Sequence, residues 1–397
     1  PAAVDYAKIY RHRFNVLHAA FRRSRHADTP AYRAFCGENA VWLEDYSLYM
    51  AVKMHFGGHE WLRWPEDIRM REPEALARCG RELAEETAFW KFCQFKFFEQ
   101  WRALKSYANG LGVEIIGDIP IYVALDSADV WAHPEQFQLD GQRRPSRVAG
   151  VPPDMFSSDG QLWGNPLYDW ERMAREDYAW WKLRMKFSSE LYDVVRIDHF
   201  VGIAHYYSIP AGEDTAKNGV WVDGPGEGLL AAISSVMGGR RVIAEDLGIV
   251  IPEVGRMLRK SGYPGMKLMQ FGFDSGPDNE YLPCHYDKNV VVYGGTHDNE
   301  TLAGFFAHQP RKVLRFARAY LGVRRSREIP WALIRAGYAS SADTAVFQMQ
   351  DLLGLGNEAR MNTPSTIGDN WRWRLDEGRL TPGMAHKLRE LAELYGR

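Results

Sequence analysis

The sequence predicts an α/β protein, a (β/α)8 TIM barrel with helical insertions, and three observations favour this class. Beyond about residue 110, short β-branched or apolar runs alternate with helical segments, an order typical of parallel sheets and barrels. A loop follows each run before the next helical segment begins. Acidic residues stand directly behind several of the runs, where a barrel gathers its functional groups at one mouth.

Residues 1–110 are predicted to form a helical region ahead of a barrel domain that covers residues 111–397. From Glu85 to Leu104, apolar side chains recur every three or four positions, as they do on one face of a helix. This spacing predicts a long amphipathic helix that ends at Asn109-Gly110. Its aromatic residues are interpreted as packing residues.

Six runs in the second region are predicted to be strands, two fewer than a complete barrel contains. Because the chain begins with Pro1, we expect one or two N-terminal strands to lie upstream of it. Residues 124–169 and 208–228 are predicted to be long loops, and loops of this length in a compact domain are more often functional than not. The six runs are residues 113–123, 194–198, 241–245, 266–271, 289–293 and 344–349.

The composition limits the class of partner. Lys and Arg number 49 against 51 Asp and Glu, so the chain lacks the basic surface that nucleic acid or an anionic membrane requires. It has no run of 18 apolar residues, and its four cysteines form no Cys-x-x-Cys pair, which argues against a disulfide framework or a zinc ribbon. The formal net charge of -2 predicts an uncharged substrate. Since the N-terminus shows no secretory signal, we expect a cytoplasmic protein.

Four carboxylic acids, Asp118, Asp198, Glu245 and Asp298, lie where apolar runs end. Carboxyl groups that converge at a barrel mouth suit the cleavage of glycosidic bonds. There, an anion stabilises an oxocarbenium-like transition state while a protonated carboxyl donates a proton to the departing oxygen. In a retaining reaction one carboxylate is a nucleophile, which suits transfer of the bound sugar to another sugar.

Two other interpretations of these acids remain open from the residues alone. An acid at a strand end commonly caps the following helix or pairs with arginine, and Arg196 lies two residues before Asp198 on the same strand face. Carboxylates at a barrel mouth also bind divalent metal ions in many enzymes of sugar acids and phosphates. Aromatic residues of the predicted loops are candidates for stacking on flat sugar faces. They are Trp163, as the first choice, and Trp131, Tyr168 and Trp221.

Three motifs around the acids resemble the signatures of the 4-α-glucanotransferases, the amylomaltases or disproportionating enzymes of glycoside hydrolase family 77. They are Arg196-Ile197-Asp198-His199-Phe200, Ala244-Glu245-Asp246-Leu247-Gly248 and Gly295-Thr296-His297-Asp298-Asn299. The likeness runs from about residue 10 to the C-terminus and implies a barrel of the α-amylase superfamily. Other segments that resemble the family are 117–123, 150–154, 160–168, 264–267 and 360–364.

The resemblance implies roles for individual residues. Asp198 would be the nucleophile, Glu245 the general acid/base, and Asp298 the carboxylate that stabilises the transition state. Residues 150–165 would form an active-site loop that covers the centre and guides the glucan, and no metal or organic cofactor is implied. The substrate-binding residues that the resemblance implies are Arg196, His297, Asp118, Trp163, Asn165, Asp154 and Tyr122.

The expected function is therefore that of a 4-α-glucanotransferase, which transfers α-1,4-glucan segments between maltodextrins by a retaining double displacement. Glucose or maltodextrins would be the acceptors. Two alternatives stand beside it, an α-glucan hydrolase on the same fold and a truncated, inactive glucan-binding fragment. One departure from the family pattern is Ser365, which stands where glycine is expected in an Asn-x-Pro-Gly-Thr segment.

Overall fold

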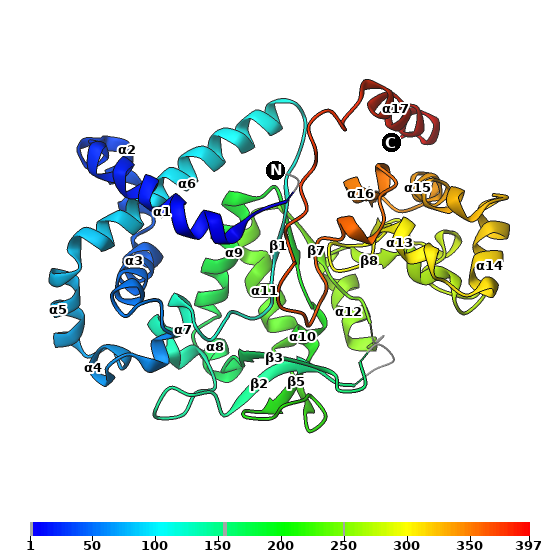
Figure 1. The fold of residues 1–397 in the computed structure, drawn as a ribbon. Coiled ribbons are helices and arrows are strands. Elements are labelled where there is room, and N and C mark those ends of the chain that lie inside the picture. Colours follow the sequence, from blue (N-terminus) through cyan, green and yellow to red (C-terminus); the bar gives the residue numbers. More distant parts are fainter. Residues whose placement is uncertain (1–2, 154–156, 249–250) are drawn as a thin grey trace. The chain divides into compact units, whose positions relative to one another are not determined.

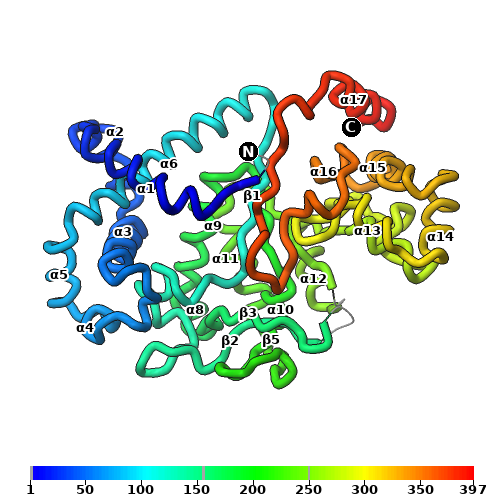
Figure 2. The backbone as a smooth tube through the Cα atoms, in the orientation of Figure 1, coloured from blue at the N-terminus to red at the C-terminus, as the bar shows by residue number. Residues whose placement is uncertain are grey.

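The structure, a computed structural model, describes residues 3–153, 157–248 and 251–397 (Figure 1 and Figure 2). The chain folds into two compact units. The N-terminal unit contains residues 8–242 and 251–257, and the C-terminal unit contains residues 1–7, 243–250 and 258–397. Strand β7 (Arg241–Ala244) has two residues in each unit.

Helices dominate the first 110 residues, as the sequence predicts (Figure 1). The predicted long helix is confirmed by α6 (Ala84–Gly110), which buries Phe89, Phe92, Phe95 and Phe98. Rings three positions apart are neighbours on the helix surface, and the row they form winds around the helix, so that Phe89 packs in one core cluster and Phe95 and Phe98 in another. The helices before α6 are α1 (Tyr6–Arg23), α2 (Pro30–Glu38), α3 (Ala40–His55), α4 (Glu66–Arg69) and α5 (Pro73–Glu82).

Parallel strands β1 (Ile116–Ile119) and β4 (Val194–Ile197) pair in the N-terminal unit, with Asp118 directly opposite Arg196. All four residues of β4 are buried, as expected for a parallel strand that is covered on both faces. In the strand order, β7 follows β4. The predicted run 113–123 ends earlier than expected as a strand because Pro120 has no N–H for the ladder.

Helix packing requires a glycine in β1. A Cβ atom at Gly117 would lie 2.1 Å from the ring of Tyr192, the residue that follows α9 (Ala179–Leu191). The ring therefore takes the space that a side chain at residue 117 would need. The other helices between β1 and β7 are α7 (Ala128–Ala132), α8 (Trp170–Arg175), α10 (Val201–Ala204) and α11 (Gly226–Met237).

The C-terminal unit contains a second parallel sheet. Its strands are β8 (Gly265–Leu268), β9 (Val290–Tyr293) and β10 (Thr344–Val346), in the order β10-β9-β8. The core beside it includes Met269 and Val292, both fully buried. All six predicted strands are thus confirmed in position. Helices α12 (Pro252–Ser261), α13 (Leu302–Ala307), α14 (Arg311–Leu321), α15 (Ile329–Ala339), α16 (Met349–Leu352) and α17 (Pro382–Tyr395) complete the described helices.

The prediction of loops over residues 124–169 and 208–228 is wrong in part, because these segments supply most of an antiparallel sheet in the N-terminal unit. Its strand order is β3-β2-β5-β6, and in Figure 1 β2, β3 and β5 lie side by side. The expected covering loop 150–165 is therefore strand at both ends. Pairing partners such as Val148 and Ile209 are far apart in sequence, so local composition does not reveal them. The strands are β2 (Arg147–Val151), β3 (Gln161–Pro166), β5 (His205–Pro210) and β6 (Val220–Asp223).

None of the helices in the described ranges combines the length with the apolar character that crossing a bilayer demands.

Ser365, the departure from the family pattern, has a φ of 61° and so lies in the left-handed region that favours glycine. We expect Ser365→Gly to stabilise the C-terminal unit by about 0.5–1 kcal/mol, because glycine removes the clash between Cβ and the backbone. Thermal melting of the purified variant measures this. Ser365→Ala is the matched control, since it keeps Cβ; a gain of equal size in that variant would rule out backbone strain as the cause.

Candidate functional site

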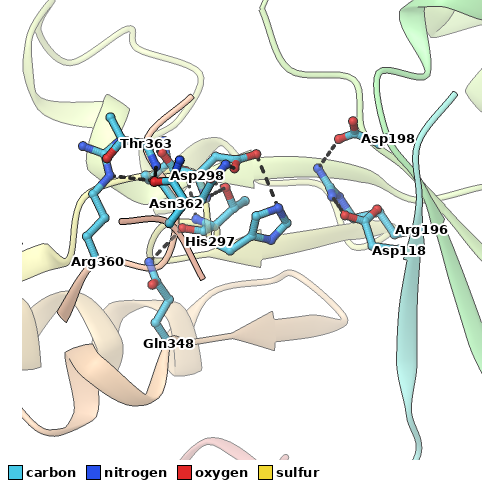
Figure 3. A network of polar contacts seen from close by, with 12 residues as sticks. Asp118, Arg196, Asp198, His297, Asp298, Gln348, Arg360, Asn362 and Thr363 are labelled. Atoms are coloured by element: carbon cyan, nitrogen blue, oxygen red, sulfur yellow. Dashed lines mark hydrogen bonds and ion pairs between the residues drawn. The ribbon is translucent and has the colours of Figure 1, made fainter. Parts of the chain in front are cut away.

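Arg196 holds two of the predicted acids together in the N-terminal unit (Figure 3). Its guanidinium is buried, with 7% of the side chain exposed, whereas the side chains of Asp118 and Asp198 are 37% and 40% exposed. The Nη1 group donates to Asp118 Oδ2, and Nη2 donates to Asp198 Oδ1 at 3.0 Å. One arginine therefore orients two carboxylates whose outer faces reach solvent.

The backbone fixes where the Asp198 carboxylate starts. Asp198 is the first residue after β4, and its N–H donates to the Ile119 carbonyl at 3.0 Å. The next residue, His199, has a φ of 48°, which turns the chain sharply away from the strand. Burial lowers the pKa of His199 to about 4, so this imidazole is neutral at pH 7.

Strand β3 places two further predicted residues near this turn. The indole of Trp163 packs edge-on against the His199 ring, with the ring centres 4.8 Å apart. Asn165 donates from Nδ2 to the Val123 carbonyl at 2.9 Å, which ties β3 to the segment after β1. Trp163 is half-buried and therefore offers part of its ring surface to solvent.

Tyr122 lies beneath these residues, with 5% of its surface exposed. Its ring contacts Trp163, with the ring centres 6.2 Å apart, and stacks on Tyr168 at 5.8 Å. Burial raises its pKa. Asp154, another predicted substrate-binding residue, lies outside the described residues.

Two of the loop aromatics are core residues instead of sugar-stacking platforms. Trp131 and Tyr168 are both completely buried, so no ring face remains for a ligand. Tyr168 also donates its hydroxyl to the Ile121 carbonyl at 2.8 Å. Trp221 is 41% exposed on β6 and stays a candidate. The sequence placed Trp131 and Tyr168 in a predicted loop, and this position did not reveal that the fold buries them.

Glu245 belongs to the C-terminal unit and follows β7 directly. Its Oε1 accepts the N–H of Leu247 at 3.1 Å, so the carboxyl is held close to its own loop. The neighbouring Asp246 turns inward, where Oδ1 accepts the Met266 N–H at 2.7 Å and burial raises the pKa of the carboxyl. A Cβ atom at Gly265 would lie 2.5 Å from Asp246 Oδ2, so only glycine fits there.

Tyr281 is a neighbour of Glu245 that no sequence motif revealed. Burial raises the pKa of its hydroxyl to about 12. The negative charges of Glu280, Asp246 and Glu245 act in the same direction. A neutral phenol therefore lies within the electrostatic range of the predicted acid/base.

Asp298 is the centre of a hydrogen-bond network in the C-terminal unit (Figure 3). Asn362 donates from Nδ2 to Asp298 Oδ1 at 2.6 Å, and His297 Nε2 lies 3.4 Å from Oδ2. Arg360 donates to the Asp298 carbonyl at 2.7 Å and to the Asn362 carbonyl at 2.8 Å. Gln348 donates to the Thr296 carbonyl at 2.9 Å, which fixes the start of the same loop.

The roles of Arg360 and Asn362 in this network were missed from the sequence. Both belong to the segment 360–364 that resembles the family, and this motif was the available signal. Asn362 is 64 positions from Asp298, so only the fold shows that the two side chains meet. The predicted pairing of Asp198 with Arg196 is observed. Asp198 and Asp298 both stay partly exposed.

The described residues contain no cluster of three or more His, Cys, Asp and Glu side chains with the geometry of a metal site. The carboxylates of Asp118 and Asp198 in the N-terminal unit, and that of Asp298 in the C-terminal unit, are held by neighbouring polar groups and are partly exposed to solvent. Such groups can donate or accept protons and can stabilise developing positive charge.

Asp351 supports the loop of Asp298 from inside the core. It is completely buried on α16, and its Oδ1 accepts the Leu302 N–H at 2.6 Å at the start of α13. Among the described residues its Oδ2 has no hydrogen-bond partner. Burial raises the pKa of Asp351 to about 7, so the folded protein binds a proton that the unfolded chain has released above about pH 4.

This linkage predicts that stability is lost as pH rises. The contribution of neutral Asp351 is fully present below about pH 4 and disappears through pH 7, with a total of about 4 kcal/mol. We expect Asp351→Asn, which cannot ionise, to melt with a flatter pH profile between pH 4 and 8. The measurement is the difference in melting temperature between the unaltered chain and Asp351→Asn at each pH, because the two proteins share all other titratable groups. Parallel profiles would contradict a buried, neutral Asp351.

Comparisons with known proteins agree across the chain. The sequence model of glycoside hydrolase family 77, described as 4-alpha-glucanotransferase, matches residues 2–381. A 4-alpha-glucanotransferase of Thermus thermophilus is 48% identical over 401 residues, which covers 98% of this chain and 80% of the relative. One of Clostridium butyricum is 42% identical over 396 residues, with 99% and 81% covered.

A solved structure is also similar over the whole chain. An amylomaltase from Streptococcus agalactiae in complex with acarbose matches with a TM-score of 0.96 and 39% sequence identity. The match covers 100% of this chain and 81% of the other. The similarities include all the segments that carry the strand-end acids.

Proposed function

Because the chain belongs to glycoside hydrolase family 77, the 4-α-glucanotransferases, whose reaction is the transfer of glucan segments, we propose that Asp198 is its nucleophile. Glu245 is the general acid/base, and Asp298 stabilises the transition state. Of the functions that the sequence left open, transfer is thus preferred to hydrolysis and to glucan binding alone.

The proposed reaction has two displacements at the anomeric carbon. In the first, an Asp198 carboxylate oxygen bonds to C1 of the donor glucosyl residue, while the C1–O bond breaks and Glu245 gives its proton to the departing glucan. In the second, Glu245 removes the proton from the 4-hydroxyl of an acceptor glucan, whose oxygen attacks C1 and displaces Asp198. Both inversions together retain the α configuration.

The observation that supports this proposal best is the bond between Arg196 and Asp198. A buried guanidinium that donates at 3.0 Å to a carboxylate 40% exposed favours its ionised form and fixes its direction. Because 40% of the side chain is exposed, a substrate can approach the carboxylate. In the C-terminal unit, Asn362 and His297 orient Asp298 in the same manner.

Substrate contacts extend the proposal to the other predicted residues. The substrates are α-1,4-glucans and maltooligosaccharides, with glucose or maltodextrins as acceptors. Trp163 offers an aromatic face for a glucosyl ring, and a covering segment that limits water favours attack by a sugar hydroxyl. The residues proposed to bind the glucan are Arg196, His297, Asp118, Trp163, Asn165, Asp154 and Tyr122.

The fold class belongs to the same proposal. The chain has an α/β fold that matches an amylomaltase, and we assign residues 111–397 to a (β/α)8 catalytic barrel of the α-amylase superfamily, with residues 1–110 as a helical insertion. Two three-stranded sheets among the described residues, with the parallel pairs β1–β4, β8–β9 and β9–β10, support this assignment. A cytoplasmic location stays a prediction.

Trapping the covalent intermediate tests the central assignment. In 5-fluoro-α-D-glucosyl fluoride, the fluorine at C5 slows both displacements. Because fluoride is a good leaving group, the first displacement stays fast enough to occur, and the glucosyl ester accumulates. After proteolysis, mass spectrometry should find the added fluoroglucosyl mass on the peptide that contains Asp198. Label on a peptide with Glu245 or Asp298 would overturn the assignment.

A further inference from the structure

A cavity of about 380 Å³ lies in the N-terminal unit, between helices of the first 110 residues and helices α7 and α9. This volume is within the range of small-molecule sites, roughly 300–1,000 Å³. The proposed reaction does not use it. Its aromatic wall consists of Trp42, Tyr46, Phe97, Phe98, Trp180 and Phe187.

Some of these rings keep surface for a ligand. Phe97 is 49% exposed although it belongs to the aromatic helix α6, and Trp42, Trp180 and Phe187 are half-buried. Trp42 and Phe187 meet at 6.2 Å between ring centres, with their planes inclined at 76°. Such walls suit a flat, amphipathic ligand, because ring faces bind its C–H surface.

Three titratable groups of the cavity wall, Asp45, His133 and Arg184, already have partners within the protein. Asp45 accepts from Arg71 at 2.6 Å, and His133 Nδ1 lies 3.7 Å from Glu135. Arg184 donates to the carbonyls of Pro120 and Ile121. Because these three groups are already bonded within the protein, a neutral ligand fits the cavity better than an ionic one.

Hydrogen-bonding groups remain beside the rings. Gln94 donates from Nε2 to the Tyr46 hydroxyl at 3.1 Å, which leaves its amide oxygen as an acceptor. The exposed carboxylate of Asp129 and the hydroxyl of Ser188 also line the cavity. Rings next to acceptors for hydroxyl groups form a surface that matches the two sides of a glucosyl residue.

We propose that this cavity is a second, non-catalytic binding site for neutral maltooligosaccharide segments of a long α-glucan. It goes beyond the transfer reaction, since it binds a part of the glucan that does not react. Arg184 lines the cavity and reaches the residues that follow β1, so the cavity is one side chain away from the strand of Asp118. A glucan held there stays at a high effective concentration for further turnovers.

Transfer kinetics of Phe97→Ala with a short and a long substrate test the site. Because an aromatic anchor in a pocket carries much of the binding energy, we expect the KM for amylose to rise about tenfold, equivalent to about 1.4 kcal/mol, while kcat and the kinetics with maltotriose stay unchanged. Tyr107→Ala is the matched control. It removes another aromatic side chain of α6, 69% exposed and outside the cavity lining, and should behave as the unaltered chain.

Two outcomes would overturn the proposal: an unchanged KM for amylose, and an equal loss with maltotriose, which would mean damage to the catalytic groups. Asp129→Ala provides a second variant should Phe97→Ala melt at a lower temperature. Binding of maltoheptaose to Asp198→Ala separates the cavity proposal from the assignment of Asp198 as the nucleophile. If adding Phe97→Ala to this variant lowers the number of bound maltoheptaose molecules by one, the lost molecule was bound in the cavity. Transfer that persists in Asp198→Ala would refute the nucleophile but leave this result intact.

Discussion

Asp198→Ala is expected to abolish glucan transfer, with a loss of kcat of about 10⁴-fold or more, the magnitude typical for removal of a nucleophile. Without the carboxylate no glucosyl ester forms, and the guanidinium of Arg196 loses the acceptor that Asp198 provides. Incubation with maltotriose followed by chromatography measures the effect. The unaltered chain should give glucose and a ladder of longer maltodextrins, and the variant should leave maltotriose unchanged.

The control for this prediction is another acid at a strand end. Asp223 closes β6, its side chain is 93% exposed, and its partner is His205 instead of Arg196. Asp223→Ala should retain the full ladder. Substantial transfer by Asp198→Ala would contradict the assignment, and glucose with maltose but no longer products from the unaltered chain would contradict transfer itself.

Glu245→Gln is expected to slow transfer from maltotriose by about 10²–10⁴-fold, since glutamine keeps the shape of the side chain but cannot give a proton to the leaving sugar. Fluoride needs no proton to depart. With α-glucosyl fluoride, the variant should therefore release a rapid burst of fluoride close to the enzyme concentration. Slow turnover follows, because the second displacement lacks its base.

The size of the fluoride burst shows whether Glu245 is the general acid/base or a residue that only shapes the site. Stopped-flow detection of fluoride compares the first displacement with the steady state in one experiment. If the burst falls as far as the turnover of maltotriose, Glu245 is not the acid. Glu280→Gln is a matched control, because Glu280 pairs with Lys267 and lies near Tyr281 in the same unit, and it should keep both phases.

The strands and their acids were predictable because their signals are local. A short apolar run such as Val194–Ile197 excludes water on both faces, and the polar residue that follows it marks the strand end. The motif around Asp298 likewise carries its identity in five consecutive residues. The same reasoning extended the run 266–271 too far, because 3-10 helical geometry begins at Met269.

Other features depend on residues that meet only after folding. The antiparallel sheet was mistaken for loops because Val148 gains its ladder from Ile209, and strand stability comes from such pairs more than from intrinsic preference. Trp131 looked like a loop aromatic, yet the fold buries it completely. Burial depends on what covers a residue, and that is a property of the whole unit.

The sequence by itself determined the family, the α/β class, the positions of six strands and the four acids that lie in or shortly after four of them, because each is written in a few adjacent residues. Only the tertiary structure decided that Arg196 bridges Asp118 and Asp198, that Asn362 holds Asp298, and that buried Asp351 finds no partner for Oδ2 among the described residues. Orientation and desolvation of a charged group are set by distant neighbours, and these become neighbours only when the chain has folded.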